Sequence, residues 1–161
     1  MGLVARLTNT ITLADLASKR WADAHPGEPV LVHGATKAVR SDRELPVGRG
    51  AHWATSRRGA VLVTPKRVVC GDWDVPVDEI VSAELLSFRS LLSGGQMLKL
   101  ATRSGQHYQF GLQHDDRWDG PLPFPVKRGA VELGWSAFSI VVRVVLLVAV
   151  GWWIWAQFAG V

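Results

Sequence analysis

Residues 97–112 read MLKLATRSGQHYQFGL, and the fold that we expect rests on this stretch. Apolar and polar side chains alternate in 98–102 and again in 107–112, on either side of the turn residues 103–106. A period of two places successive side chains on opposite faces of a strand, and a glycine-containing turn joins two such strands. The stretch therefore predicts a β-hairpin with one buried face.

The same period continues upstream of this hairpin, in short segments separated by Gly, Pro and charged residues. We expect strands near residues 30–39, 51–56, 60–64, 68–70, 75–77 and 80–86. Loops are expected at 41–50 and 93–95, and a tight turn at 57–59. A short closing helix is expected from Asp115 to Trp118. Short strands at regular spacing are typical of an antiparallel sandwich or a partly open barrel.

The segment 1–24 has a helical rather than a strand period. Leu3, Leu7 and Ile11 form one apolar stripe, and Thr12 followed by Asp15 resembles a capping box for a second helix. His25-Pro26-Gly27 would end that helix. Because its charges are few, we expect this amphipathic segment to pack on protein.

Three stretches, with a later tryptophan, carry a resemblance to a known family. They are 59–69 (GAVLVTPKRVV), 75–84 (VPVDEIVSAE) and 98–110 (LKLATRSGQHYQF), followed by Trp118. Their order resembles the bacterial pleckstrin-homology-like (PH-like) and GRAM-like domains over residues 28–119. The resemblance implies a mainly β fold, a bent antiparallel barrel of about seven strands with one end closed by a helix.

The resemblance also implies a candidate binding surface. Relatives of this fold that bind phosphoinositides place Lys and Arg after the first strand, and phosphates favour such donors. The matching headgroup contacts here are Lys37, Arg40, Arg43, Arg57 and Arg58. Asp42 and Glu44 dilute this positive charge, so the alternative is a loop that is solvated or only loosely attracted to lipid.

The C-terminal region is the most apolar part of the chain. After a Pro- and Gly-containing linker at 120–134, residues 135–161 are long enough for one transmembrane helix, which needs about 20 apolar residues. Trp135 at one end and Trp152, Trp153 and Trp155 near the other are predicted membrane-interface anchors. Since all 18 Lys and Arg lie at or before Arg143, including Lys127 and Arg128 just ahead of the span, the N-terminal domain is predicted to be cytoplasmic and the C-terminus outside the bacterial inner membrane.

Arg143 is the charged residue of the predicted span. Glu132, Ser136, Ser139 and Arg143 are spaced to share one helical face, which would suit a partner or lipid contact in the membrane. The alternative is that Arg143 snorkels to the headgroups, because helical side chains lean toward the N-terminus.

Composition excludes several classes of function. The single cysteine, Cys70, rules out an internal disulfide framework, and the five histidines show no metal-ligand spacing. The net charge of +4 and the single tyrosine give no expectation of nucleic-acid binding. Asp72, Asp74, Asp115 and Asp116 read as turn and cap residues, and no catalytic motif or cofactor motif occurs.

These observations predict a non-catalytic, tail-anchored protein with a PH-like domain. It would be an accessory or assembly subunit of a larger bacterial membrane complex, with other integral membrane proteins as partners. The alternative is a module that senses anionic lipids through its basic residues.

Overall fold

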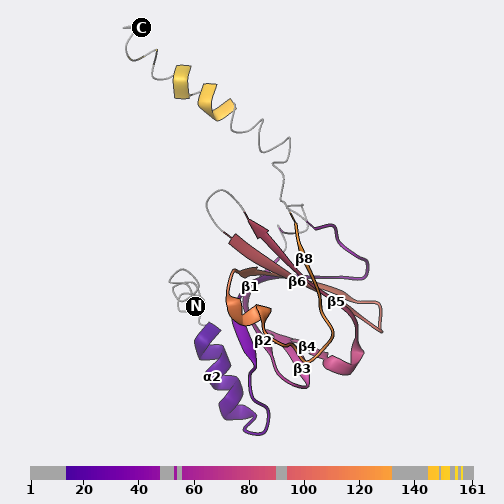
Figure 1. The fold of residues 1–161 in the computed structure, drawn as a ribbon. Coiled ribbons are helices and arrows are strands. Elements are labelled where there is room, and N and C mark those ends of the chain that lie inside the picture. Colours follow the sequence, from indigo (N-terminus) through magenta and orange to yellow (C-terminus); the bar gives the residue numbers. More distant parts are fainter. Residues whose placement is uncertain are drawn as a thin grey trace.

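The computed structural model describes residues 14–47, 53, 56–89 and 94–131, and in the C-terminal region 145–148, 150–152, 155 and 157. Most of these residues belong to one eight-stranded sheet, ordered β4-β3-β2-β1-β7-β6-β5-β8. Its strands are β1 (Val32–Ser41), β2 (Arg57–Val63), β3 (Arg67–Cys70), β4 (Trp73–Pro76), β5 (Ile80–Arg89), β6 (Gly94–Thr102), β7 (His107–Gln113) and β8 (Lys127–Ala130). The sheet curls into a half-barrel (Figure 1).

The sheet confirms a mainly β fold but corrects its details. There are eight strands rather than about seven, and they form a half-barrel rather than a barrel. All neighbouring strands are antiparallel except β5 and β8, which are parallel. The β6–β7 hairpin forms as the alternation predicts, and Gly105 at its turn has a φ of 80°, which favours glycine.

One local prediction upstream is wrong, and strand pairing explains why. Residues 57–59 are not a turn: they belong to β2, where Arg57, Arg58 and Gly59 pair with Ala38, Lys37 and Thr36 of β1. Of the strand expected at 51–56, only positions 53 and 56 are described. Trp53 lies in a helical turn, and the Ser56 hydroxyl donates to the Trp53 carbonyl at 2.7 Å.

The concave face of the sheet holds the main apolar core, and one end of it is closed by η3 (Asp116–Asp119). Alternate residues of the strands point inward, among them Val61, Leu98 and Phe110. Trp118 on η3 is buried, and its ring would lie 3.5 Å from a Cβ added at Gly34 of β1. The short closing helix predicted from sequence is therefore confirmed.

The segment after η3, within the expected linker, also packs on the sheet. Phe124 is buried in the core, and the Pro- and Gly-containing stretch then leads into β8. The register of β8 beside β5 pairs Glu84 with Lys127 and Ser87 with Ala130.

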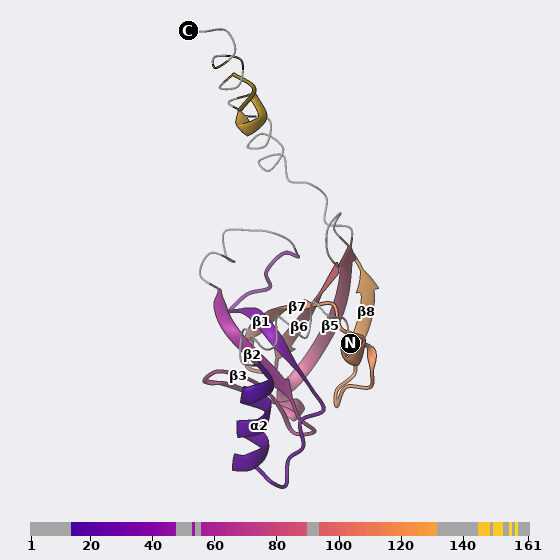
Figure 2. The same ribbon diagram turned by 90° about the vertical axis from the view of Figure 1, so that its left-hand side faces the viewer.

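The convex face is covered in two places. Helix α2 (Ala14–Ala24) forms where the capping pattern predicts a helix, and it lies beside β1 and β2 (Figure 2). Its Asp15 contacts His33 at 2.9 Å. Farther along, the carbonyl of Leu45 accepts a hydrogen bond from Gln109 Nε2 at 2.8 Å. The loop after β1 therefore lies over the outside of β7. Residues 1–13 of the predicted amphipathic N-terminal segment lie outside the described part of the chain.

The prediction of a transmembrane helix over 135–161 is contradicted. In the part of the chain that the structure describes, no helix is both long and apolar enough to cross a membrane. Helical residues are described there only as 145–148, 150–152, 155 and 157, whereas a span needs about 20 consecutive residues. The fold class with a C-terminal span, and the single-pass inner-membrane localisation drawn from it, are corrected accordingly.

Candidate functional site

Two arginines flank one indole at the end of the half-barrel remote from Trp118. Arg40 Cζ lies 5.6 Å and Arg57 Cζ 5.0 Å from the ring centroid of Trp73. Tyr108 meets the same ring edge-on at 5.8 Å. Guanidinium groups at this distance are attracted by the ring quadrupole, so Trp73 holds both cations near each other. We call Arg40, Trp73 and Arg57 the Arg–Trp cluster.

The register of β1 and β2 decides which basic residues join this cluster. Ala38 pairs with Arg57 and is fully buried in the core, so Arg57 and, two residues along β1, Arg40 are on the concave side. Lys37 pairs with Arg58, and both of these exposed side chains are on the convex side. The five predicted headgroup contacts are therefore divided between the two faces of the sheet.

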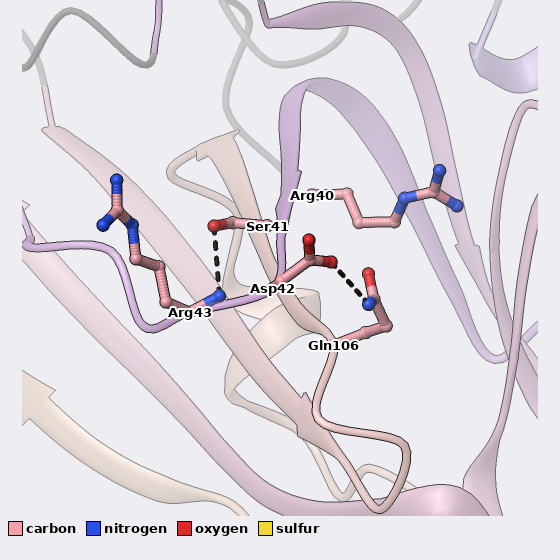
Figure 3. A pocket seen from close by; sticks show the side chains of 5 residues that line it. All are labelled: Arg40, Ser41, Asp42, Arg43 and Gln106. Atoms are coloured by element: carbon pink, nitrogen blue, oxygen red, sulfur yellow. Dashed lines mark hydrogen bonds between the residues drawn. The ribbon is translucent and has the colours of Figure 1, made fainter.

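An open depression lies next to the cluster, at the end of β1 (Figure 3). It is lined by Arg40, Ser41, Asp42, Arg43 and Gln106. Gln106 Nε2 donates to Asp42 at 2.7 Å, and the backbone N–H of Arg43 donates to Ser41 Oγ at 3.2 Å. These bonds fix the loop backbone. In the figure the Arg40 and Arg43 side chains point to opposite sides of Asp42, so Arg43 does not join the Arg–Trp cluster.

Charge at this end is only partly compensated. Arg57 forms an ion pair with Asp72, which follows the left-handed Gly71 in the β3–β4 turn. Asp42 is bonded to Gln106, and within the described residues neither Arg40 nor Arg43 has a carboxylate partner. The half-exposed Trp73 thus carries one paired and one unpaired guanidinium, an arrangement suited to an added anion.

Trp73 and Tyr108 are not among the site residues predicted from the sequence. The tryptophan in the turn-like stretch Gly71-Asp72-Trp73 was an indication, because a large aromatic side chain beside a tight turn usually packs against residues of another strand. Which partner it finds depends on the β1–β7 pairing, which sets Arg40 opposite Tyr108.

The predicted membrane contacts are not brought together as a site. Glu132, Trp135, Ser136, Ser139, Arg143 and Trp153 lie outside the described residues. Trp152 and Trp155 are described; both are exposed, and their ring centroids lie 5.4 Å apart.

Other titratable groups serve the fold. Asp115 caps η3 by accepting from the Arg117 backbone N–H at 3.1 Å, and Asp74 accepts from Arg67 at 2.7 Å. Burial raises the pKa of the Cys70 thiol to about 11, which makes it a poor nucleophile. Among the described residues no group of His, Cys, Asp and Glu side chains could hold a metal ion.

Comparison with models of known protein families and with curated proteins finds no match for this chain.

Proposed function

We propose that the chain is a non-catalytic interaction module that binds a phosphate-bearing anion at the Arg–Trp cluster. The observation that carries this proposal is the placement of two guanidinium groups at 5.6 and 5.0 Å from one indole, with Arg40 free of any carboxylate partner in the described chain. It retains the predicted role of Arg40 and Arg57 as headgroup contacts and adds Trp73 as the residue that orients them.

The chemistry of the cluster favours a phosphate over a single carboxylate. Each guanidinium presents a planar fork of donors that matches two phosphate oxygens. Stacking on an aromatic ring leaves the edge of the guanidinium, where its N–H groups lie, directed away from the ring face. An anion beside Trp73 would thus meet donors from both β1 and β2, and it would compensate the charge of Arg40.

The test is binding of phosphate-bearing probes to the purified chain. Inositol 1,4,5-trisphosphate serves as a soluble probe, titrated by calorimetry. Vesicles of phosphatidylcholine, with and without phosphatidylglycerol, serve as a lipid probe in co-sedimentation. Since a hydrogen bond to a charged group contributes about 1.5–3 kcal/mol, Arg40→Gln or Arg57→Gln should weaken binding about tenfold or more.

Arg20→Gln is the matched control, because Arg20 is an exposed arginine on α2. It removes the same charge and should leave binding within about twofold, as expected for a distant surface charge screened by salt. Equal losses in all three variants would show nonspecific attraction to net positive charge and would overturn the proposal. Binding of the vesicles but not of the soluble probe would identify the anion as a lipid headgroup.

The prediction of an accessory subunit stays a prediction. It drew on the polar face around Arg143, on the amphipathic N-terminal segment 1–24 and on the short proline-containing linker. Of these, the polar face and residues 1–13 lie outside the described part of the structure.

A further inference from the structure

The open depression beside the Arg–Trp cluster has room for more of a ligand than its phosphate. Arg40 belongs to both places, because its guanidinium lies over Trp73 and its side chain lines the depression (Figure 3). The volume of the depression is about 920 Å³, within the range of about 300–1,000 Å³ that is usual for small-molecule sites. A ligand whose phosphate meets Arg40 would therefore place its neighbouring atoms in the depression.

The lining of the depression offers a hydrogen-bond acceptor beside the positive charge. Asp42 and Gln106 point toward each other in Figure 3, and Gln106 Nε2 donates to Asp42 Oδ1 at 2.7 Å. Asp42 is exposed, and its second carboxylate oxygen accepts no hydrogen bond from the described residues. Ser41 Oγ accepts from the backbone N–H of Arg43 at 3.2 Å, so the hydroxyl hydrogen of Ser41 stays available.

Two strands hold the Asp42 carboxylate in place. Asp42 follows Ser41, which pairs with His107 of β7, and Gln106 precedes His107. The Gln106 backbone is held in turn by Thr102: its N–H donates to Thr102 Oγ1 at 3.1 Å, and its carbonyl accepts from the Thr102 N–H at 2.9 Å. The acceptor is therefore positioned before a ligand binds, which lowers the cost of ordering it.

A carboxylate at this place selects the atoms that accompany the phosphate. It repels a further anionic oxygen, but it accepts a hydrogen bond from a hydroxyl group. The phosphate ester of a polyol carries both groups, phosphate oxygens for the guanidinium and hydroxyls for the carboxylate. A simple alkyl phosphate has no hydroxyl on its carbon chain and gains no such bond.

We propose that the Arg–Trp cluster and the depression together bind the phosphate ester of a polyol. The phosphate lies at Arg40 and Arg57, and a hydroxyl of the ligand donates to Asp42. This inference rests on the proposed function, because it takes the anion at the cluster to be a phosphate, and it adds Asp42 as a residue that determines specificity. Free glycerol phosphate and the headgroup of phosphatidylglycerol share this chemistry.

The experiment compares ligands of equal charge on the unchanged chain. Glycerol phosphate and propyl phosphate differ only in two hydroxyl groups, and each is titrated while ¹H–¹⁵N spectra follow the backbone signals of residues 40–43 and 106. One added hydrogen bond should make glycerol phosphate bind about fivefold more tightly. Vesicles that contain phosphatidylglycerol or phosphatidylethanol form the second pair, because only the first of these lipids has headgroup hydroxyls.

The two pairs separate the sources of the ligand and the two proposals. A preference between the free esters would show that the soluble ester suffices, and a preference between the vesicles alone would identify a lipid headgroup. Equal binding within both pairs would overturn this inference and leave the proposed function standing. Absence of saturable binding for every phosphate-bearing probe would overturn both.

Asp42→Asn identifies the group responsible. The amide keeps the bond from Gln106 through its oxygen and puts an N–H donor in place of the free carboxylate oxygen. Propyl phosphate should then bind more tightly, and the two esters should bind within about twofold of each other. A preference that survives in this variant, or loss of both esters when a negative charge is removed, would contradict the role of Asp42.

Two further variants serve as controls. Glu79→Gln removes an exposed carboxylate on η2 (Val77–Glu79) and should keep the full preference. Arg40→Gln should weaken both esters by the same factor, because it acts on the phosphate that they share. The spectra also show whether each variant is folded.

Discussion

The two ends of the half-barrel each hold a tryptophan and arginines, but they use them differently. At the closed end Trp118 is 1% exposed, Arg117 donates to Asp115 at 2.9 Å, and Arg67 pairs with the buried Glu28 at 3.1 Å. At the open end Trp73 is half-exposed, and Arg40 has no carboxylate partner among the described residues.

The difference lies in how polar groups are satisfied. The Thr64 hydroxyl donates to Glu28 and accepts from the backbone N–H of Arg67 at 3.1 Å, so the Glu28–Arg67 ion pair is held by a further polar group of the protein. Matched, buried charges hold a fold in one arrangement, whereas unmatched, exposed charges leave donors available to a ligand. We therefore expect changes at the closed end to affect stability and changes at the open end to affect binding.

The largest effect should come from replacing the two tryptophans. Trp118→Ala leaves a cavity under η3 and should cost about 3–5 kcal/mol of unfolding free energy. Trp73→Ala removes a half-exposed ring and should cost about 1 kcal/mol, a typical value for a single substitution. Urea unfolding of both variants measures the comparison, and equal losses would contradict the distinction between the two ends.

A smaller effect is expected at Thr64, which is fully buried. Thr64→Val keeps the shape but removes the hydroxyl, so Glu28 loses a donor and the N–H groups of Lys66 and Arg67 lose an acceptor. We expect a loss of about 2 kcal/mol in urea unfolding. Thr64→Ser keeps the hydroxyl and is the control; a Val variant no less stable than the Ser variant would show that the network contributes little.

The smallest effect is the dependence of stability on acid. The hydrogen bond from Thr64, with the charge of Arg67, lowers the pKa of Glu28 despite its burial, and Arg117 outweighs burial to lower that of Asp115. Both pKa values are lower in the folded chain than their ordinary 4.5 and 3.8, so this stabilisation is full above about pH 5 and is lost as pH falls through the folded values.

Urea midpoints between pH 6 and pH 3 check this expectation. Asp115→Asn should reduce the acid dependence, because the Arg117 pair no longer titrates. Arg40→Gln, at the open end, should leave the pH dependence of the urea midpoint unchanged. A weaker pH dependence in that variant would contradict the assignment of the acid-sensitive groups to the closed end.

Local pattern predicted much of the sheet because alternation reports a buried face. It placed the 97–112 hairpin, the helix around Leu16 and the closing turn at Trp118, all of which carry their signals within a few residues. It could not place β8, whose four residues are all exposed and owe their strand form to backbone pairing with β5. The apolar run at 135–161 also predicted a membrane-spanning helix, and the described residues contain no such helix.

The candidate sites were harder to predict than the strands. The sequence predicted Arg40 and Arg57 as headgroup contacts but grouped them with Lys37 and Arg58, which the register puts on the other face. The contact between Asp42 and Gln106 gave no signal in the sequence, since one lies in a loop and the other in a turn, and the pairing of β1 with β7 brings them together.

By itself the sequence determined the mainly β class, the hairpins and the helix start, since these follow from periods and turns of a few residues. The tertiary structure alone decided which charges are compensated. Glu28 meets Arg67, and Arg40 meets Trp73, across separations of 39 and 33 positions (67 − 28 and 73 − 40). Such meetings depend on strand order and register, because a shift of one residue moves every side chain to the opposite face.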